Sequence, residues 1–243
     1  MAASDTIAVR PMTKAEVGIA VDWAEQEGWN PGLSDGECYY AVDPRAFFAV
    51  LLDGRLIGSF SIMVYPGGFA FGGFYILKPA YRGRGIGLAI QEHADRLAGA
   101  YNLGIDGVFA MQDRYAAHGF LFSHRNIRYE GIGGGTRPGG LVEVASVSFD
   151  AITRYDACHF PVKRPEFLRH WLAQPGATAL VALEAGEISG YGQVRLCRRG
   201  AKIGPLFGDT PEIAERIYRG LSAAVPGQPL FLDVPEPNSA GVL

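Results

Sequence analysis

The sequence predicts an α/β (α+β) protein with a mixed, mostly antiparallel central sheet flanked by helices, followed by a second, degenerate copy of the same fold. Two observations support this prediction. Short apolar runs alternate with stretches whose apolar residues recur at three- and four-residue steps, the spacing of one helix face. After a glycine-rich break at 131–140, the same order of elements returns. We therefore expect two domains, at 1–132 and 141–243.

The first half is expected to contain three antiparallel strands before a glycine-rich turn, because Asp53-Gly54 between two apolar runs is a strong hairpin signal. A helix starts at Ile86 and stops at Gly99. The expected strands are 6–10, 46–52, 55–64, 69–77, 104–110 and 120–129, and the other expected helices are 14–27 and 112–118.

The second half is expected to repeat this order with little residue identity. Its expected strands are 141–149, 177–183, 188–196, 201–207 and 230–234, and its expected helices are 165–172 and 211–224. The chain ends at Leu243, just after the last of these strands. We expect either a naturally short domain or a piece of a longer protein, and both alternatives stay open.

The stretch 81–87, Tyr-Arg-Gly-Arg-Gly-Ile-Gly, carries the clearest chemical signal. A strand, a glycine-rich turn and a helix in this order present free N–H groups and a partial positive charge, which favour a phosphate. The loop lacks the Gly-Lys-Ser/Thr of a P-loop and the Gly-x-Gly-x-x-Gly spacing of a dinucleotide site. A turn that only packs a helix on a sheet is the plainer alternative.

What the loop does match is Arg-x-x-Gly-x-Gly, formed by Arg82, Gly85 and Gly87. This pattern resembles the acetyl-CoA pyrophosphate loop of the GNAT N-acetyltransferases. The resemblance covers about residues 6 to 130, and the repeated organisation resembles the tandem-domain bacterial GNAT proteins. It implies the GNAT fold and acetyl-CoA as co-substrate, with no metal. The CoA-binding residues that it implies in the loop are Arg82, Gly83, Arg84, Gly85, Ile86 and Gly87.

The same resemblance assigns roles outside the loop. The backbone N–H groups of Ile76 and Leu77 are expected to polarise the thioester carbonyl. Tyr115 lies in a Tyr-x-x-x-Gly-Phe segment and is expected to protonate the departing thiolate as general acid. Gln112 stands where the family often has an asparagine that contacts CoA.

The residues that bind the acceptor are less clearly marked. The resemblance places Trp29, Asn30, Glu37 and Tyr39 in the acceptor-binding region, and aromatic plus polar groups on a loop suit a small polar ligand. Strand 69–77 has no carboxylate, so the general base stays open between Glu37, Asp106 and a water relay. Arg128 lies on an expected strand, where it lines the acceptor cleft or faces solvent.

The second copy is expected not to bind CoA, because Gly208-Asp209-Thr210-Pro211-Glu212 stands where the first copy has its loop. Asp209 or Thr210 is suited to cap the following helix, with Pro211 just inside it. A cap satisfies the N–H groups that a phosphate needs, and the acidic pair repels one.

Composition excludes some partners. The formal net charge of −3 gives no global basic field for nucleic acid, and no apolar stretch reaches membrane-spanning length. The three cysteines show no paired metal spacing. Residues 1–5 carry no signal sequence, so a cytoplasmic location is expected. The expected partner is a small-molecule or peptide amine, and a homodimer is left open.

We therefore expect an acetyl-CoA-dependent N-acetyltransferase, in which a primary amine of a small molecule, amino acid or peptide attacks directly in a ternary complex. The alternative is a non-catalytic acyl-CoA-binding or sensing module, which would keep the loop and lose turnover.

Overall fold

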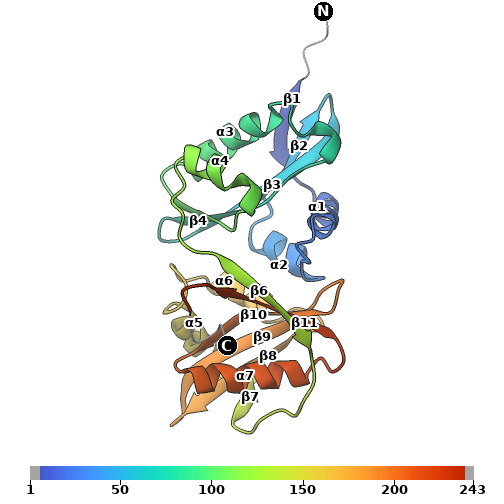
Figure 1. Cartoon of the computed structure of the whole chain (residues 1–243). Helices are drawn as coiled ribbons and strands as arrows, with labels where there is room; N and C mark the ends of the chain where they lie inside the picture. The colour runs from blue at the N-terminus through green and yellow to red at the C-terminus, as the bar shows by residue number, and fades with distance from the viewer. Residues whose placement is uncertain (1–5, 239–243) are drawn as a thin grey trace, which may run out of the picture. The chain divides into compact units, whose positions relative to one another are not determined.

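The computed structural model describes residues 6–238. Residues 1–5, on which the location expectation depends, and the end of the chain at Leu243 lie outside the described residues. The chain divides into two compact units (Figure 1). The first holds Met1–Pro31, Asp35–Asp106 and Val162–His170, and the second holds Gly32–Ser34, Gly107–Pro161 and Trp171–Leu243.

In chain order the strands and helices are β1 (Ile7–Pro11), α1 (Lys14–Gln26), α2 (Asp35–Val42), β2 (Phe47–Leu52), β3 (Arg55–Tyr65), β4 (Phe69–Leu77), α3 (Ile86–Ala98), β5 (Asn102–Ile105), α4 (Gln112–Ala117), β6 (Asn126–Ile132), β7 (Leu141–Glu143), α5 (Phe149–Asp156), α6 (Pro165–Trp171), β8 (Thr178–Glu184), β9 (Glu187–Leu196), β10 (Ala201–Gly208), α7 (Pro211–Ala223) and β11 (Pro229–Pro235).

The first unit is built on a five-stranded sheet in the order β1-β2-β3-β4-β5. Its neighbouring strands are antiparallel except β4 and β5, which run parallel. Successive side chains of β2 point to opposite faces. Phe48 belongs to the core under α3, whereas Phe47 contacts Phe74 on the face where α1 packs against β4. Helices therefore cover both faces of this sheet.

The second unit repeats the arrangement in a six-stranded sheet, β6-β11-β10-β9-β8-β7, in which only β10 and β11 are parallel. Helix α7 packs on β8, β9 and β10 (Figure 1). Glycine makes a close approach to β9 possible, because a Cβ on Gly190 would lie 2.7 Å from Ile217 of α7. The mixed, mostly antiparallel sheets that the sequence predicts are therefore confirmed in both halves.

The strand at the end of the first half differs from its prediction. The sequence places 120–129 as the last strand of the first sheet, but β6 pairs antiparallel with β11 in the second sheet. Arg128 is the partner of Asp233 in this register. Strand β5 also starts and ends earlier than predicted, because its pairing with β4 runs from Asn102 to Ile105.

Two short helices were not predicted, α2 and α5. In α2, Gly36 lowers the helix signal, but its missing Cβ lets the helix approach Val21 of α1, where a Cβ would lie 2.7 Å from the valine. In α5, the buried face carries Asp156 beside Ile152. The hydroxyl of Tyr191 donates to Asp156 Oδ1 at 2.5 Å, which stabilises a buried carboxylate that periodicity analysis counts as polar.

Candidate functional site

The start of α3 has the features of an anion-binding helix end. Its N-cap is Gly85, in the left-handed region at φ 80°, and no side chain caps the helix. Gly83 is also left-handed, at φ 75°, and no atom lies within 4 Å of the place where a Cβ on either glycine would stand. The first turn therefore presents main-chain N–H groups toward open space, which is the arrangement that a diphosphate requires.

Gly87 has a different role from the other two glycines. The hydroxyl of Tyr75 donates to the carbonyl oxygen of Gly87 at 2.6 Å, and a Cβ on Gly87 would lie 3.2 Å from that hydroxyl. The missing side chain makes room for Tyr75, which ties the first turn of α3 to β4.

The two arginines of the loop both have partners. The guanidinium of Arg82 donates from Nε to the carbonyl oxygen of Leu77 at 2.8 Å and pairs with the carboxylate of Glu27. The guanidinium of Arg84 lies over the ring of Tyr81, 5.7 Å from its centroid. The positive charge of Arg82 is thus offset by a carboxylate. Arg84 stands between the two open glycines, Gly83 and Gly85, in the sequence.

Strands β4 and β5 separate next to this loop. Their pairing ends at Gly72 and Ile105, whereas β4 continues to Leu77. A bulge interrupts β4 in the separated part, because Ser59 pairs with Ile76 but Ser61 pairs with Gly73. Phe74, inside the bulge, has φ 49°, and Ser59 Oγ donates to its carbonyl oxygen at 2.8 Å. The bulged part of β4 therefore has an edge that β5 does not cover.

Of the two predicted amides on β4, that of Leu77 faces this uncovered edge. The N–H of Lys78 donates to the carbonyl oxygen of Ile57 on β3 at 2.9 Å. Because backbone groups alternate in direction along a strand, Ile76 faces β3 and Leu77 faces away from it. The contact of Arg82 with the Leu77 carbonyl agrees with this orientation.

The end of α1 packs beside the bulge. Trp23, Ala24 and Ile76 form a small buried cluster, and Trp29 packs against it with Phe74. Trp29 is thus half-buried next to β4. Asn30, the next residue, is 8% exposed and has φ 49°.

The other predicted acceptor residues do not gather at one point. Glu37 forms an exposed ion pair with Lys14 at 3.0 Å. The ring of Tyr39 packs on Phe167 of α6, with centroids 5.4 Å apart. Asp106 is exposed just after β5. Arg128 lies in the second unit, where its Nε donates to Asp233 Oδ1 at 2.7 Å.

Tyr115 is held by the segment that follows β5. Its ring packs so closely on Gly107 that a Cβ there would lie 2.4 Å from it, and the ring of Phe120 meets it edge-on at 6.1 Å. Burial raises the pKa of the Tyr115 phenol above its usual 10.0, and a hydrogen bond with the Val108 backbone partly opposes this. The phenol is therefore protonated at neutral pH, as a general acid must be. Gln112 is the first residue of the same helix, α4.

Glu25 was missed by the sequence reasoning. Its Oε2 is buried and has no hydrogen-bond partner among the described residues, and it lies on α1 just before the loop that contains Trp29. The sequence could not single out Glu25, because what distinguishes it is a carboxylate oxygen without a hydrogen-bond partner in the described part of the chain, and that is visible only in the structure.

The second copy is closed at the corresponding helix. The side chain of Thr210 accepts from the N–H of Ile213, and Pro211 is the first residue of α7, as predicted. Asp209 accepts a hydrogen bond from the hydroxyl of Tyr155 at 2.7 Å. The N–H groups and the acidic side chain at this end are thus already engaged within the second unit.

In the second copy, the parallel strands β10 and β11 also separate, after Ile203 and Leu232. The backbone carbonyl just beyond this point, that of Gly204, already accepts a hydrogen bond. Trp171 Nε1 donates to the carbonyl oxygen of Gly204 at 3.1 Å, and Arg195 lies over the Trp171 ring at 4.5 Å.

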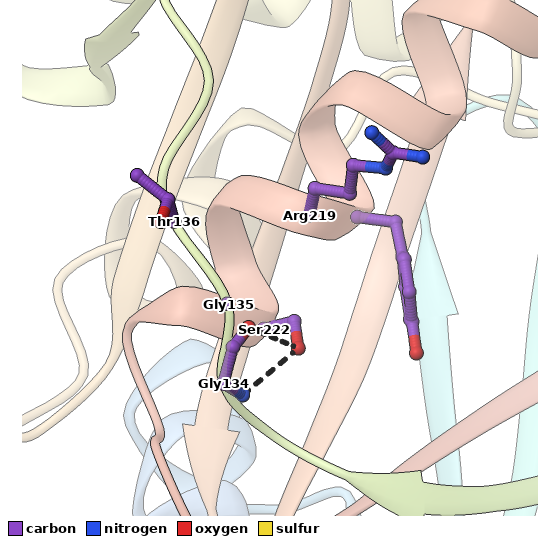
Figure 2. A pocket seen from close by; sticks show the side chains of 6 residues that line it. Gly134, Gly135, Thr136, Arg219 and Ser222 are labelled. Carbon is purple, nitrogen blue, oxygen red and sulfur yellow. Dashed lines mark hydrogen bonds between the residues drawn. The ribbon is translucent and has the colours of Figure 1, made fainter.

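A hollow of about 460 Å³ lies elsewhere in the second unit, between α7 and the glycine-rich segment. Figure 2 shows how Ser222 of α7 binds this segment: its Oγ accepts from the N–H of Gly134 at 3.2 Å and donates to the Gly134 carbonyl at 3.1 Å. Arg219, also on its wall, is paired with Glu215. None of the predicted site residues lines this hollow, and the glycine-rich break at 131–140 contacts α7 here.

A parallel strand pair that separates beside an uncapped glycine-rich helix start is the arrangement that the GNAT resemblance implies, and comparison with known proteins agrees. The family model described as Acetyltransferase (GNAT) family matches residues 17–121, and a second, described as Acetyltransferase (GNAT) domain, matches residues 152–242. The chain therefore belongs to the GNAT superfamily of acyltransferases and carries two GNAT domains in tandem.

Individual relatives are similar at lower identity. A holothin acyltransferase from Pseudoalteromonas sp. (strain SANK 73390) is 25% identical over 93% of this chain and 78% of its own length. A Pyrococcus horikoshii protein described as an acetyltransferase has a TM-score of 0.80 at 23% identity, covering 97% of this chain and 82% of that one. A tandem GNAT protein from the clavulanic acid biosynthesis pathway, without AcCoA, has a TM-score of 0.61 at 15% identity, covering 98% and 92%. These structures support the fold.

Within residues 6–238, no three His, Cys, Asp or Glu side chains come together as metal ligands would. None of the helices in that range combines the length and apolar character needed for a membrane crossing.

Proposed function

We propose that the chain is an acetyl-CoA-dependent N-acetyltransferase that acts on a primary amine of a small molecule, an amino acid or a peptide. The observation that supports this most is the uncapped start of α3, with open glycines at 83 and 85, beside the uncovered edge of β4. The relative named holothin acyltransferase supports acyl transfer as the class of reaction.

In the proposed reaction, the main-chain amides of 83–87 and the guanidinium of Arg84 hold the diphosphate of CoA. Each charge-assisted hydrogen bond of this kind contributes about 1.5–3 kcal/mol. The thioester then lies along β4, and the N–H of Leu77 donates to the carbonyl oxygen as it becomes an oxyanion.

The chemical step is a direct displacement. The amine nitrogen forms a bond to the acyl carbon, the carbon–sulfur bond breaks, and the nitrogen loses a proton to a base or to water. The thiolate takes its proton from Tyr115, a role that rests on the Tyr-x-x-x-Gly-Phe resemblance.

Glu37, Asp106 and a water relay remain the alternatives for the base that accepts the amine proton, and Glu25 is a further carboxylate that comes just before the predicted acceptor loop in the chain. Glu37 is paired with Lys14 in solvent, whereas Glu25 has a buried oxygen that finds no hydrogen-bond partner among the described residues. We propose Glu25 as the residue that receives the ammonium group of the acceptor.

The test is thiol release from acetyl-CoA in the presence of a panel of amines, comparing the wild type with Tyr115→Phe. We expect amine-dependent release, and a loss of about 10²–10⁴-fold in kcat for the variant with little change in the KM for acetyl-CoA. Tyr101→Phe, a half-exposed tyrosine that follows α3, is the matched control and should retain full activity. Saturable CoA binding without amine-dependent release would favour the sensing module instead.

A further inference from the structure

Arg82 joins three segments of the first unit. Its Nε–H is donated to the carbonyl oxygen of Leu77 at 2.8 Å, and its terminal nitrogen pairs with Glu27. Glu27 is the C-cap of α1, and Arg82 itself begins the glycine-rich loop. One guanidinium thus connects the end of a helix, the end of β4 and the start of the proposed diphosphate loop.

Each of the joined ends is next to a feature of the proposed site. Leu77 carries the amide that faces the uncovered edge of β4, and the carbonyl of the same residue receives the hydrogen bond from Arg82. Two residues beyond Glu27, Trp29 packs against the buried cluster that contains Ile76. A movement of Arg82 would therefore shift the glycine-rich loop, the Leu77 amide and the segment that contains Trp29 together.

Electrostatics argues against a simple cationic role for Arg82. The guanidinium is already engaged by a carboxylate, and that carboxylate would repel an incoming diphosphate. If only charge mattered here, Glu27 would weaken CoA binding. A planar guanidinium that spans two acceptors at fixed positions is instead the geometry by which arginine fixes backbone position, which a lysine cannot reproduce.

We propose that Glu27 and Arg82 are positioning residues: together they form a clamp that sets the diphosphate loop and the Leu77 amide in register, while the loop amides and Arg84 contact the diphosphate. This inference rests on the proposed function, because it assigns a task to two residues of the same site.

The first test is a calorimetric titration of the full chain with CoA, comparing the wild type with Glu27→Gln. The substitution removes a negative charge close to the diphosphate, so charge alone predicts tighter binding. The clamp predicts the opposite sign, a weakening of about fivefold, which corresponds to the loss of about one hydrogen bond. Unchanged or tighter binding by Glu27→Gln would overturn the clamp.

The second test separates geometry from charge at Arg82 itself. Arg82→Lys keeps the charge but cannot span Leu77 and Glu27, so we expect its CoA affinity to fall as far as that of Arg82→Gln, within about twofold. Arg55→Lys, at an exposed arginine where β3 begins, is the matched control and should keep the wild-type affinity, because Arg55 lies outside the proposed site. Retention of wild-type affinity by Arg82→Lys would show that charge is sufficient and would contradict the clamp.

A third measurement needs no ligand. Hydrogen exchange of the free protein should show faster exchange at the hydrogen-bonded amides of Tyr81, Arg82 and Leu88 in Glu27→Gln and Arg82→Lys than in the wild type, with α7 unchanged. Equal exchange in all three proteins would contradict the clamp. Failure of the wild type to bind CoA, with this exchange difference still present, would overturn the proposed function and leave the clamp standing.

Discussion

Gly85 combines three features that the proposed diphosphate site requires. It is both the N-cap of α3 and a left-handed residue at φ 80°, and the space beside it is open. A non-glycine residue here is strained in the backbone and also places a side chain where the diphosphate would lie.

For this reason Gly85→Asp should weaken CoA binding strongly, by at least about tenfold, because a carboxylate at the N-cap satisfies the N–H groups of α3 and repels the diphosphate. Calorimetric titration measures the change. Gly186→Asp is the matched control, since Gly186 has φ 87° and open space in the β8–β9 turn of the second unit. Equal CoA affinity of Gly85→Asp and the wild type would show that the diphosphate does not bind at the start of α3.

Glu16 shows how a single residue links helix formation to pH. It forms a capping box with Thr13 at the start of α1 and also accepts hydrogen bonds from Arg10. The hydrogen bond from Arg10 is the main cause that lowers the pKa of Glu16 to about 2. The carboxylate therefore stabilises the folded state above its ordinary pKa of 4.5, and this contribution is lost as the pH falls toward 2.

We expect Glu16→Gln, which keeps the capping geometry but removes the charge, to lower the free energy of unfolding by about 1 kcal/mol at pH 7. The difference from the wild type should shrink between pH 4.5 and pH 2, where the wild-type carboxylate takes up its proton. Urea unfolding across this range measures it. A difference that stays constant with pH would mean that the Arg10 interaction carries no charge-dependent stability.

At the scale of elements, the sequence predicts the strands, turns and helices that are marked by neighbouring residues in the chain. Both copies of the strand–turn–helix unit and the Asp53-Gly54 hairpin were predicted from spacing and turn residues, and the structure has them. The elements that were missed depend on tertiary contact: α2 contains a glycine that only its approach to α1 explains, and α5 has a buried aspartate.

The sheet that β6 joins could not be read from the sequence, because an alternating strand gives no sign of its partner. In the structure, Arg128 stands directly opposite Asp233 on β11. The first half therefore supplies an edge strand to the second sheet, and the second half supplies Val162–His170 to the first unit.

A double-cysteine variant tests the pairing of β6 with β11 in the second sheet. Arg128→Cys with Asp233→Cys should form a disulfide under mild oxidation, because directly opposed residues of an antiparallel pair have compatible Cα separations. Peptide mass analysis detects the link. Arg128→Cys with Leu232→Cys is the control, since Leu232 points to the other face and should not link. Absence of the 128–233 link would place β6 in another sheet.

At the scale of the whole molecule, one copy keeps the open helix end and the other has lost it. The loop was predictable because its function depends on glycine spacing in a continuous stretch. The partners of Arg82, the direction of the Leu77 amide and the unpaired oxygen of Glu25 depend on contacts between distant segments, and no spacing encodes them.

The asymmetry between the copies gives the most direct test of the account. The full chain should bind one acetyl-CoA in a calorimetric titration, because the start of α3 is uncapped while Thr210 and Pro211 occupy the start of α7. Asp209→Ala, in the second copy, should leave both the stoichiometry and the affinity unchanged. A stoichiometry of two, or no binding at all, would contradict the claim that the first helix end alone grips the diphosphate.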